Sequence, residues 1–488
     1  MAYKHGVEVL EQPTSLVTPV EGTAGLQVIF GTAPVNLAKD PYDATNKLKL
    51  VYSFAEASEA VGYCKNFAKY TLCQSIYACF NAFNIAPIIL CNVLDPNNSA
   101  HIKALEEASY QVSNGQATIN VEGILLDKLV VKKDTTPLVA DTDYVASFDD
   151  NGYVLISLID NATTTTLTSI KASGTVLNPD GVEYTDVIGG YNTSTGVEKG
   201  LELARQVYPK FGMTPGLLLA PGWSSNANVA SVLNAKCTKI NGVFKCECII
   251  DLDSSDDGLK VYSDCKTFKE SAGVMGIHQI ALWPEVKIGT LQFAYSALYA
   301  AMVAYTDASN DDVPNLSPSN ILIGATAAVL HDGTEVVLDE EQANFMNGNG
   351  IVTVINDLGF KAWGNNTACY PSNTDPKDRW ICCRRFFSWW GNSFILTYKS
   401  KVDDNANYRL IESVCDSENI RGNSYEDQGK CAGASISFNE DENPITEILN
   451  GHIQFHQKLA PYTPAECITV LLEFDPTILQ AKLSGGEA

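Results

Sequence analysis

Apolar and polar residues alternate near the N-terminus in a pattern that predicts a β-strand. Tyr3, Val7 and Val9 alternate with Lys4 and Glu8, so one face of this strand would be apolar and the other charged. A connector rich in Pro and Gly follows in place of a nearby hairpin partner. Residues 1–22 are therefore expected to form an arm whose strand pairs either within its own subunit or with another molecule.

The next part of the chain has a mixed α/β pattern. Residues 86–93 are almost entirely apolar, as in a strand whose sheet is covered on both faces. Similar apolar strands are predicted at 216–220 and 248–252. Helices are predicted over six segments: 54–63, 70–83, 103–110, 195–208, 226–235 and 288–305.

Residues 113–187 interrupt this pattern with a segment rich in Thr, Val, Asp and Gly. Asp149 to Gly152 form a strong hairpin signal between two alternating runs. Short strands are predicted at 125–131, 144–148, 153–159 and 166–170. An all-β domain inserted at 113–187 into one α/β domain, made of 23–112 and 188–364, explains this order better than three independent domains would.

The character changes again after Gly364. Residues 380–398 are rich in aromatic side chains, and 409–415 have a helical pattern. Alternating strands are predicted at 452–458 and 468–474, with Ile453 and Phe455 on one face. The expected fold is α/β (α+β) and multidomain: a split α/β core, an inserted all-β domain, a C-terminal α+β domain at 365–488, and extended terminal arms.

Composition and charge exclude several classes of protein. The 488 residues carry 33 Lys and Arg against 57 Asp and Glu, a formal net charge of −24. An acidic surface of this kind is repelled by nucleic-acid backbones and by anionic membranes, so neither is expected as a partner. No apolar run reaches the length of a membrane span, and no signal peptide is predicted. The 14 cysteines are scattered, which is typical of reduced thiols.

The sequence predicts no catalytic, metal-binding or cofactor-binding residues. The turn Pro221 to Asn226 is placed like a nucleophile elbow but lacks its second Gly, so Ser225 or Asn226 is expected to cap a helix. The acidic segment 251–257 departs from the spacing of a calcium loop. Cys246 and Cys248 are expected on one face of a strand, without the second pair that a zinc site needs.

A basic cluster stands out against the acidic composition. Lys377, Arg379, Arg384 and Arg385 lie close together and include three of only six arginines. The cluster could meet an acidic partner, or it could neutralise carboxylates of its own chain. The sequence leaves both interpretations open.

Short motifs in a fixed order along nearly the whole chain resemble the tail sheath proteins of contractile bacteriophages and related contractile injection machines. Only 113–187 falls outside the series, where sheath proteins carry variable insertions. The motifs are Tyr3 to Glu11, Ile188-Gly189-Gly190, Ala220-Pro221-Gly222, Ser317-Pro318-Ser319-Asn320, Ala362-Trp363-Gly364, Trp380 to Arg385, and Pro464-Ala465-Glu466. The sequence departs from the family pattern at Asn365-Asn366 and in the long polar segment 402–430.

The resemblance implies a structural subunit without enzymatic activity or cofactor. Such a subunit polymerises helically around a tail tube in an extended, metastable state and contracts to drive the tube through a target envelope. Its implied partners are further copies of itself, the tail tube protein, and the baseplate and tail terminator proteins. Its implied location is the virion tail, assembled in the cytoplasm of the host bacterium.

The resemblance also implies which residues lie at subunit interfaces. Strand exchange through the N-terminal arm would use Tyr3, Val7 and Val9, and exchange through the C-terminal strands would use Ile453, Phe455, Leu471 and Phe474. The basic cluster Lys377, Arg379, Arg384 and Arg385 would contact the tube or a neighbour, and the insertion at 113–187 would face outward. Two alternatives remain: a cytosolic α/β hydrolase using the turn at 222–225, and another tail or baseplate component. A phage tail and a bacteriocin-like particle fit equally well.

Overall fold

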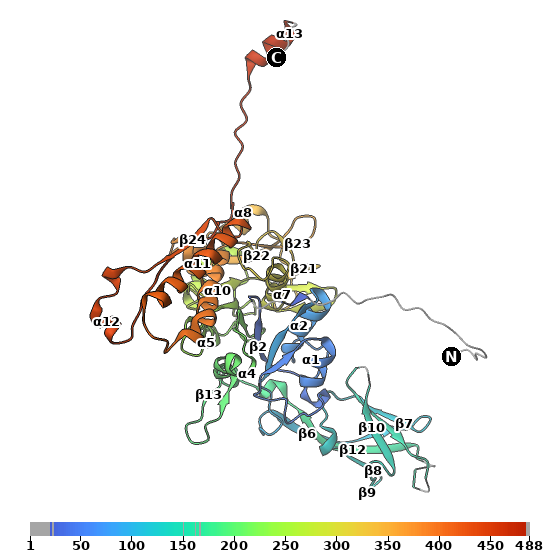
Figure 1. The fold of residues 1–488 in the computed structure, drawn as a ribbon. Helices are drawn as coiled ribbons and strands as arrows, with labels where there is room; N and C mark the ends of the chain where they lie inside the picture. Colours follow the sequence, from blue (N-terminus) through green and yellow to red (C-terminus); the bar gives the residue numbers. More distant parts are fainter. Residues whose placement is uncertain (1–19, 22–23, 150, 162, 165–166, 485–488) are drawn as a thin grey trace, which may run out of the picture.

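The computed structural model describes residues 20–21, 24–149, 151–161, 163–164 and 167–484 (Figure 1). The predicted N-terminal strand with Tyr3, Val7 and Val9 lies outside these residues. Within them, the chain folds as a mixed α/β protein with several distinct parts. No helix of the described part is long and apolar enough to cross a membrane.

A nine-stranded sheet forms the centre of the molecule, in the order β20-β23-β22-β17-β16-β15-β2-β5-β3. Its six parallel strands are fully or largely buried, which explains their continuous apolar sequences. They are β2 (Gln27–Gly31), β5 (Ile88–Asn92), β15 (Leu217–Leu219), β16 (Glu247–Asp251), β17 (Gln279–Leu282) and β22 (Ile351–Asn356). Antiparallel strands complete the sheet: β3 (Lys49–Val51), β23 (Phe360–Trp363) and β20 (Ile321–Leu322).

Helices cover both faces of this sheet, and their ends follow from local sequence. Ser53 caps α1 (Phe54–Val61), and Asn226 caps α5 (Ala227–Thr238), so the predicted capping role of Asn226 is confirmed. The most deeply buried helix is α7 (Tyr295–Ala308). The other helices of the core are α2 (Leu72–Tyr77), α3 (Tyr184–Ile188), α4 (Val207–Phe211), α6 (Cys265–Ser271) and α8 (Glu340–Asn347).

Three of the predicted helices are wrong in whole or in part. The segment 103–110 is the strand β6 (Ile102–Gln111), because it pairs along its length with β12 (Ser169–Leu177). The segment 195–208 is interrupted by Gly196 and Gly200, which have positive φ, and only a 3₁₀ turn and α4 remain. The segment 288–305 becomes helical only at Tyr295, since β18 (Glu285–Ile288) and β19 (Leu291–Phe293) precede it.

The inserted segment forms its own β structure, which protrudes from the core (Figure 1). The ribbon of β6 and β12 carries it, together with β8 (Val130–Lys133) and β9 (Thr136–Pro137). A second sheet joins β7 (Gln116–Ile119), β10 (Tyr144–Phe148) and β11 (Val154–Leu158). The predicted hairpin joins β10 to β11. Ile119, Val131 and Ile156 belong to a hydrophobic core separate from that of the central sheet.

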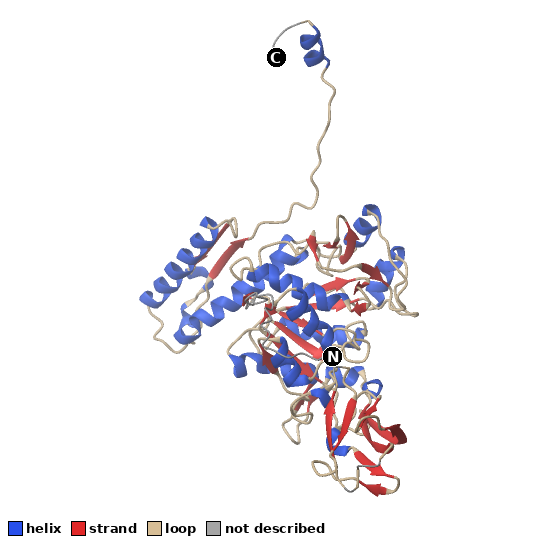
Figure 2. Ribbon diagram, turned by 90° about the vertical axis from the view of Figure 1, so that its right-hand side faces the viewer, coloured by secondary structure: helices blue, strands red, loops and turns tan. Residues whose placement is uncertain are grey.

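The C-terminal module packs against one side of the core (Figure 2). It contains α9 (Pro376–Arg379), α10 (Ile381–Tyr398), α11 (Tyr408–Asp427), α12 (Ile445–Leu449) and the antiparallel pair β24 (Gly433–Ser437) and β25 (His456–Ala460). The chain then leaves the body as an extended segment that ends in α13 (Pro476–Leu483).

Candidate subunit interface in the C-terminal module

The C-terminal arm, defined here as residues 467–484, extends away from the body (Figure 2), and its apolar side chains are exposed. The side chains of Leu471 and Leu472 are 90% and 91% exposed. Ile468, Val470 and Phe474 are also exposed, and with Leu472 they occupy every second position. In an extended chain these four side chains lie on one face, because successive residues point to opposite sides. The predicted strand at 468–474 has no pairing partner among the described residues, so its apolar face is uncovered.

The root of the arm is held firmly to the C-terminal module. The Arg379 guanidinium donates to Glu466 Oε2 at 2.8 Å and to Asn366 Oδ1 at 2.8 Å. It also lies over the Tyr370 and Trp380 rings, at 4.2 and 4.0 Å from their centroids. Arg379, one of the predicted contact residues, thus fixes where the arm leaves the body.

An apolar groove of about 660 Å³ lies between α10 and the β24–β25 pair. Ile453 and Phe455, both predicted interface residues, line it together with Trp390. Trp390 is buried, and its indole Nε1 has no hydrogen-bond partner in the described part of the chain. The other apolar residues of the lining are Phe387, Phe394, Ile436 and Leu459. The groove thus offers apolar surface beside a sheet of only two strands.

The two outer edges of this small sheet differ. At β24, the Asn419 side chain accepts from the Ile436 amide at 2.9 Å and donates to the Ile436 carbonyl at 3.2 Å. A side chain therefore occupies the outer edge of β24 at this residue. β25 has no second strand partner among the described residues, which leaves its edge available for pairing.

The basic cluster is used largely inside the protein. Arg385 is 3% exposed and forms a two-pronged ion pair with Asp307 of α7, with Nη1 3.0 Å from Oδ1. Arg384 is 6% exposed and donates to Asp378 at 2.9 Å. Both side chains are buried and paired within the subunit, so for these two residues the structure favours the other interpretation, neutralisation of the chain's own carboxylates. Lys377 remains partly exposed beside Asp375 and Asp378.

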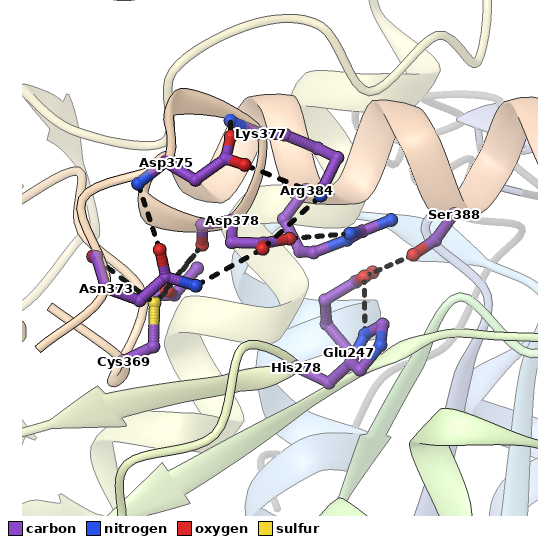
Figure 3. A network of polar contacts seen from close by, with 10 residues as sticks. Glu247, His278, Cys369, Asn373, Asp375, Lys377, Asp378, Arg384 and Ser388 are labelled. Atoms are coloured by element: carbon purple, nitrogen blue, oxygen red, sulfur yellow. Dashed lines mark hydrogen bonds and ion pairs between the residues drawn. The ribbon is translucent and has the colours of Figure 1, made fainter.

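Polar contacts tie α10 to the central sheet (Figure 3). Ser388 donates to Glu247 Oε1 at 2.7 Å, and His278 Nδ1 lies 3.4 Å from the same oxygen. Burial opposes ionisation of Glu247, but the hydrogen bond and charge of His278 keep the pKa of this carboxyl below its usual value. Because these residues come from β16, the start of β17 and α10, the contacts join the C-terminal module to the core.

The hydrolase alternative depends on the turn at 222–225, where Ser224 is buried. Its hydroxyl donates to Asp251 Oδ2 at 3.1 Å and accepts from the Asp251 amide at 3.0 Å. Asp251 also accepts from the Ser296 amide at 2.7 Å. These bonds link the ends of β15 and β16 to the start of α7, which is a structural use of the hydroxyl.

Burial raises the pKa of Asp251 to about 6, although its hydrogen bonds act in the opposite direction. In the unfolded chain this carboxyl ionises at its ordinary value of 3.8. Between about pH 4 and pH 6 the folded state therefore binds more protons than the unfolded state, and its stability falls as the pH rises. Below this window both states are protonated, and the unfavourable contribution disappears.

We expect Asp251→Asn to remove this pH dependence. Relative to the parent protein, the variant should gain up to about 3 kcal/mol in free energy of unfolding between about pH 4 and pH 7. Urea unfolding of both proteins across this range measures the difference, with Asp256→Asn in the exposed loop as the matched control. A difference that stays constant with pH would contradict the prediction.

Sequence reasoning missed the groove itself. The feature of the sequence that points to the groove is the aromatic run at 380–398. In this run Phe387, Trp390 and Phe394 recur at spacings of three and four residues. This spacing places them on one helical face, but the sequence does not show that a gap remains between that face and β25.

Known proteins resemble this chain along nearly its whole length. No protein-family model matches it. It is 23% identical to the tail sheath protein of Burkholderia phage BcepMu, over 99% of each chain. It is 24% identical to a putative prophage major tail sheath protein of Pseudomonas aeruginosa, over 57% of this chain and 70% of that protein.

Solved structures share the fold. One chain in the structure of the anti-feeding prophage baseplate has a TM-score of 0.58 to this protein at 15% identity. The match covers 97% of this protein and 100% of that chain. A chain of the PVC sheath complex, an extracellular contractile injection system in its contracted state, matches 98% of this protein and 99% of that chain, with a TM-score of 0.56 at 14% identity. The sequence is thus similar to a phage tail sheath protein along nearly its whole length, and the fold is shared with chains of contractile injection systems.

Proposed function

We propose that the protein is the structural subunit of a contractile tail sheath. The exposed apolar face of the C-terminal arm carries this proposal, because such a face needs a partner outside its own body. The whole-length similarity to a phage tail sheath protein supports it. Copies of the subunit polymerise helically around a tail tube, with a baseplate and a terminator protein at the ends. The site of action is the virion tail, assembled in the host cytoplasm.

The arm joins neighbouring subunits by adding a strand to their sheets. Backbone hydrogen bonds to the free edge of β25 would hold the strand, and its alternate apolar side chains would fill the groove beside Ile453 and Phe455. The N-terminal segment 1–22 is the second arm, with Tyr3, Val7 and Val9 as its contact residues. Both tethers allow subunits to move relative to one another without separating.

Contraction uses free energy stored when the subunits assemble in the extended state. Each subunit has two sets of contacts with its neighbours. A trigger from the baseplate lets the subunits slide and rotate from the extended set of contacts into the set of lower free energy. The contacts of α10 with Glu247 of the sheet and with Asp307 of α7 keep core and C-terminal module together during this movement.

Electron microscopy of the purified full-length protein tests the proposal. We expect long hollow helical tubes at high protein concentration. Closed rings that do not stack would instead indicate a baseplate component. Monomers that hydrolyse ester substrates, with loss of this activity in Ser224→Ala, would support the hydrolase alternative.

The inserted β domain should face outward and be dispensable for assembly. Gln111 of β6 pairs with Ser169 of β12, so residues 112–168 can be replaced by an Asn-Gly turn that joins the two strands. We expect this deletion variant to form tubes of smaller outer diameter than the full-length protein. A variant that unfolds cooperatively but forms no tubes would contradict an outward position.

A further inference from the structure

A cavity of about 520 Å³ lies between the core and the inserted domain, and it shares no residue with the groove of the C-terminal module. Its volume falls within the range of about 300–1,000 Å³ that is typical of small-molecule sites. The core contributes the turn after β2 and the connection between α1 and α2. The inserted domain contributes the connection after β7 and the turn between β10 and β11. The lining includes Asn36, Tyr63 and Tyr70 from the core, and Glu122, Asp149 and Tyr153 from the inserted domain.

Two polar side chains in this lining lack hydrogen-bond partners. Asn36 is 5% exposed, and neither its amide nitrogen nor its amide oxygen is bonded within the described part of the chain. The hydroxyl of Tyr63 is likewise buried without a partner there. Folded proteins leave few buried polar groups in this state, because each loses its bonds to water without replacement. Asn36 carries a donor and an acceptor side by side, so a molecule that satisfies both needs an adjacent acceptor and donor.

The charges of the lining argue against an ionic ligand. Glu122 and Asp149 are carboxylates, and they would repel a phosphate or another carboxylate. A metal ion or an ammonium group has no acceptor for the amide hydrogens of Asn36. Asp149 accepts from the backbone amides of Asn151 and Tyr153, both at 2.9 Å and both through Oδ1. Its second oxygen can therefore accept a hydrogen bond from a neutral ligand.

Three tyrosines give the same cavity flat apolar surface. The rings of Tyr63, Tyr70 and Tyr153 combine an apolar face with a polar edge. Burial raises the pKa of Tyr63 and of Tyr70, so both hydroxyls stay neutral and can donate as well as accept. A pyranose sugar has matching chemistry, because its ring faces carry C–H groups and its rim carries hydroxyls. Two neighbouring hydroxyls supply the donor and the acceptor that Asn36 needs.

We propose that this cavity is a binding site for a neutral monosaccharide. Asn36 and Tyr63 bind adjacent hydroxyls of the sugar, Glu122 and Asp149 accept from other hydroxyls, and a tyrosine ring packs against the sugar ring. Because the walls come from two domains, the bound sugar fixes the inserted domain relative to the core. Sugar binding does not depend on the sheath function.

The test uses the full-length protein and five sugars: glucose, galactose, mannose, rhamnose and N-acetylglucosamine. Saturation-transfer NMR should detect binding of at least one of them, and calorimetry should give a dissociation constant of about 1 mM or lower. The same sugar should raise the thermal midpoint of the protein, because it binds the folded state alone.

Two variants and a control locate the binding. Asn36→Leu keeps the size of the side chain and should weaken binding by about ten-fold or more. Its thermal midpoint should stay the same or rise, because two unpaired buried polar atoms are removed. Tyr63→Phe keeps the ring contact with Phe54, at 4.7 Å between centroids, and should also weaken binding. Asn228→Leu lies exposed on α5 outside the lining and should bind like the parent protein.

Four results would overturn the proposal. None of the five sugars could bind the folded parent protein. The sugar could bind Asn36→Leu as tightly as the parent, which would place it elsewhere. Asn36→Leu could lower the thermal midpoint, which would show that the amide serves the fold. Adenosine could bind while the sugars do not, which would assign the Asn36 amide to the edge of a nucleobase.

Discussion

Removal of residues 468–488 should leave a folded protein that no longer forms tubes. The truncation begins after Glu466 and Cys467, so it keeps the ion pair between Arg379 and Glu466 that holds the root of the arm. It removes Ile468, Val470, Leu472 and Phe474, whose exposed side chains make no contribution to the core. Electron microscopy and sedimentation should show loss of polymer, while the thermal unfolding of the monomer stays unchanged.

Two point variants make this prediction more specific. Leu472→Asp places a charge on the apolar face of the arm, where burial in a neighbour's groove would strip it of water. We expect this variant to prevent assembly. Thr469→Asp introduces the same charge on the opposite face of the extended chain and should assemble nearly as well as the parent protein. Both positions are exposed in the monomer, so neither variant should unfold.

Normal tubes from Leu472→Asp would refute strand addition through this face. Equal loss of assembly in both variants would indicate that the arm needs low charge without a defined register. In that case the period-two pattern of the arm would not govern its docking.

The second large effect concerns the buried ion pair of Arg385 with Asp307. Arg385→Met keeps an unbranched apolar stem but leaves the Asp307 carboxylate buried without its cation. Burial opposes both charges and raises the pKa of Asp307, whereas the Asp307 carboxylate raises the pKa of Arg385. The guanidinium donates to both carboxylate oxygens, and this geometry favours the ionised pair. We expect the variant to lose about 3–5 kcal/mol in free energy of unfolding. Urea unfolding followed by tryptophan fluorescence measures the loss, because Trp389 and Trp390 follow on the same helix.

Two controls separate the charge from the packing. Lys377→Met removes a partly exposed cation of the same cluster and should change stability by no more than about 0.5 kcal/mol. The double variant Asp307→Leu with Arg385→Met removes both charges and should recover most of the lost stability. If the double variant is as unstable as Arg385→Met alone, the loss arises from packing.

The sequence predicted the central sheet well where its strands are buried on both faces. The apolar run at 86–93 and the runs at 216–220 and 248–252 correspond to β5, β15 and β16. The hairpin at Asp149 to Gly152 was also correct, because its turn chemistry is local. The helix predicted at 103–110 was wrong, since the partner that makes this segment a strand lies sixty or more residues away in β12. Pairing of this kind leaves no local signal.

The candidate interface was predictable only in part. Ile453 and Phe455 alternate with polar residues, and this pattern predicted that they share one face, whereas the groove that they line was not predicted. Arg384 and Arg385 could not be assigned from their charge, because the carboxylates that pair with them are brought close by the fold. The pairing of Arg385 with Asp307 spans 78 positions and depends on how α10 packs on α7.

The ribbon of β6 and β12 has a consequence for how the protein can diversify. The chain enters and leaves the protruding domain through two hydrogen-bonded neighbours, so the ends of any replacement need only be a strand spacing apart. A different domain, an affinity tag or an enzyme whose termini lie close together can be grafted there without changing the central sheet. The site is therefore suited to the display of a second protein on the protruding side of the subunit.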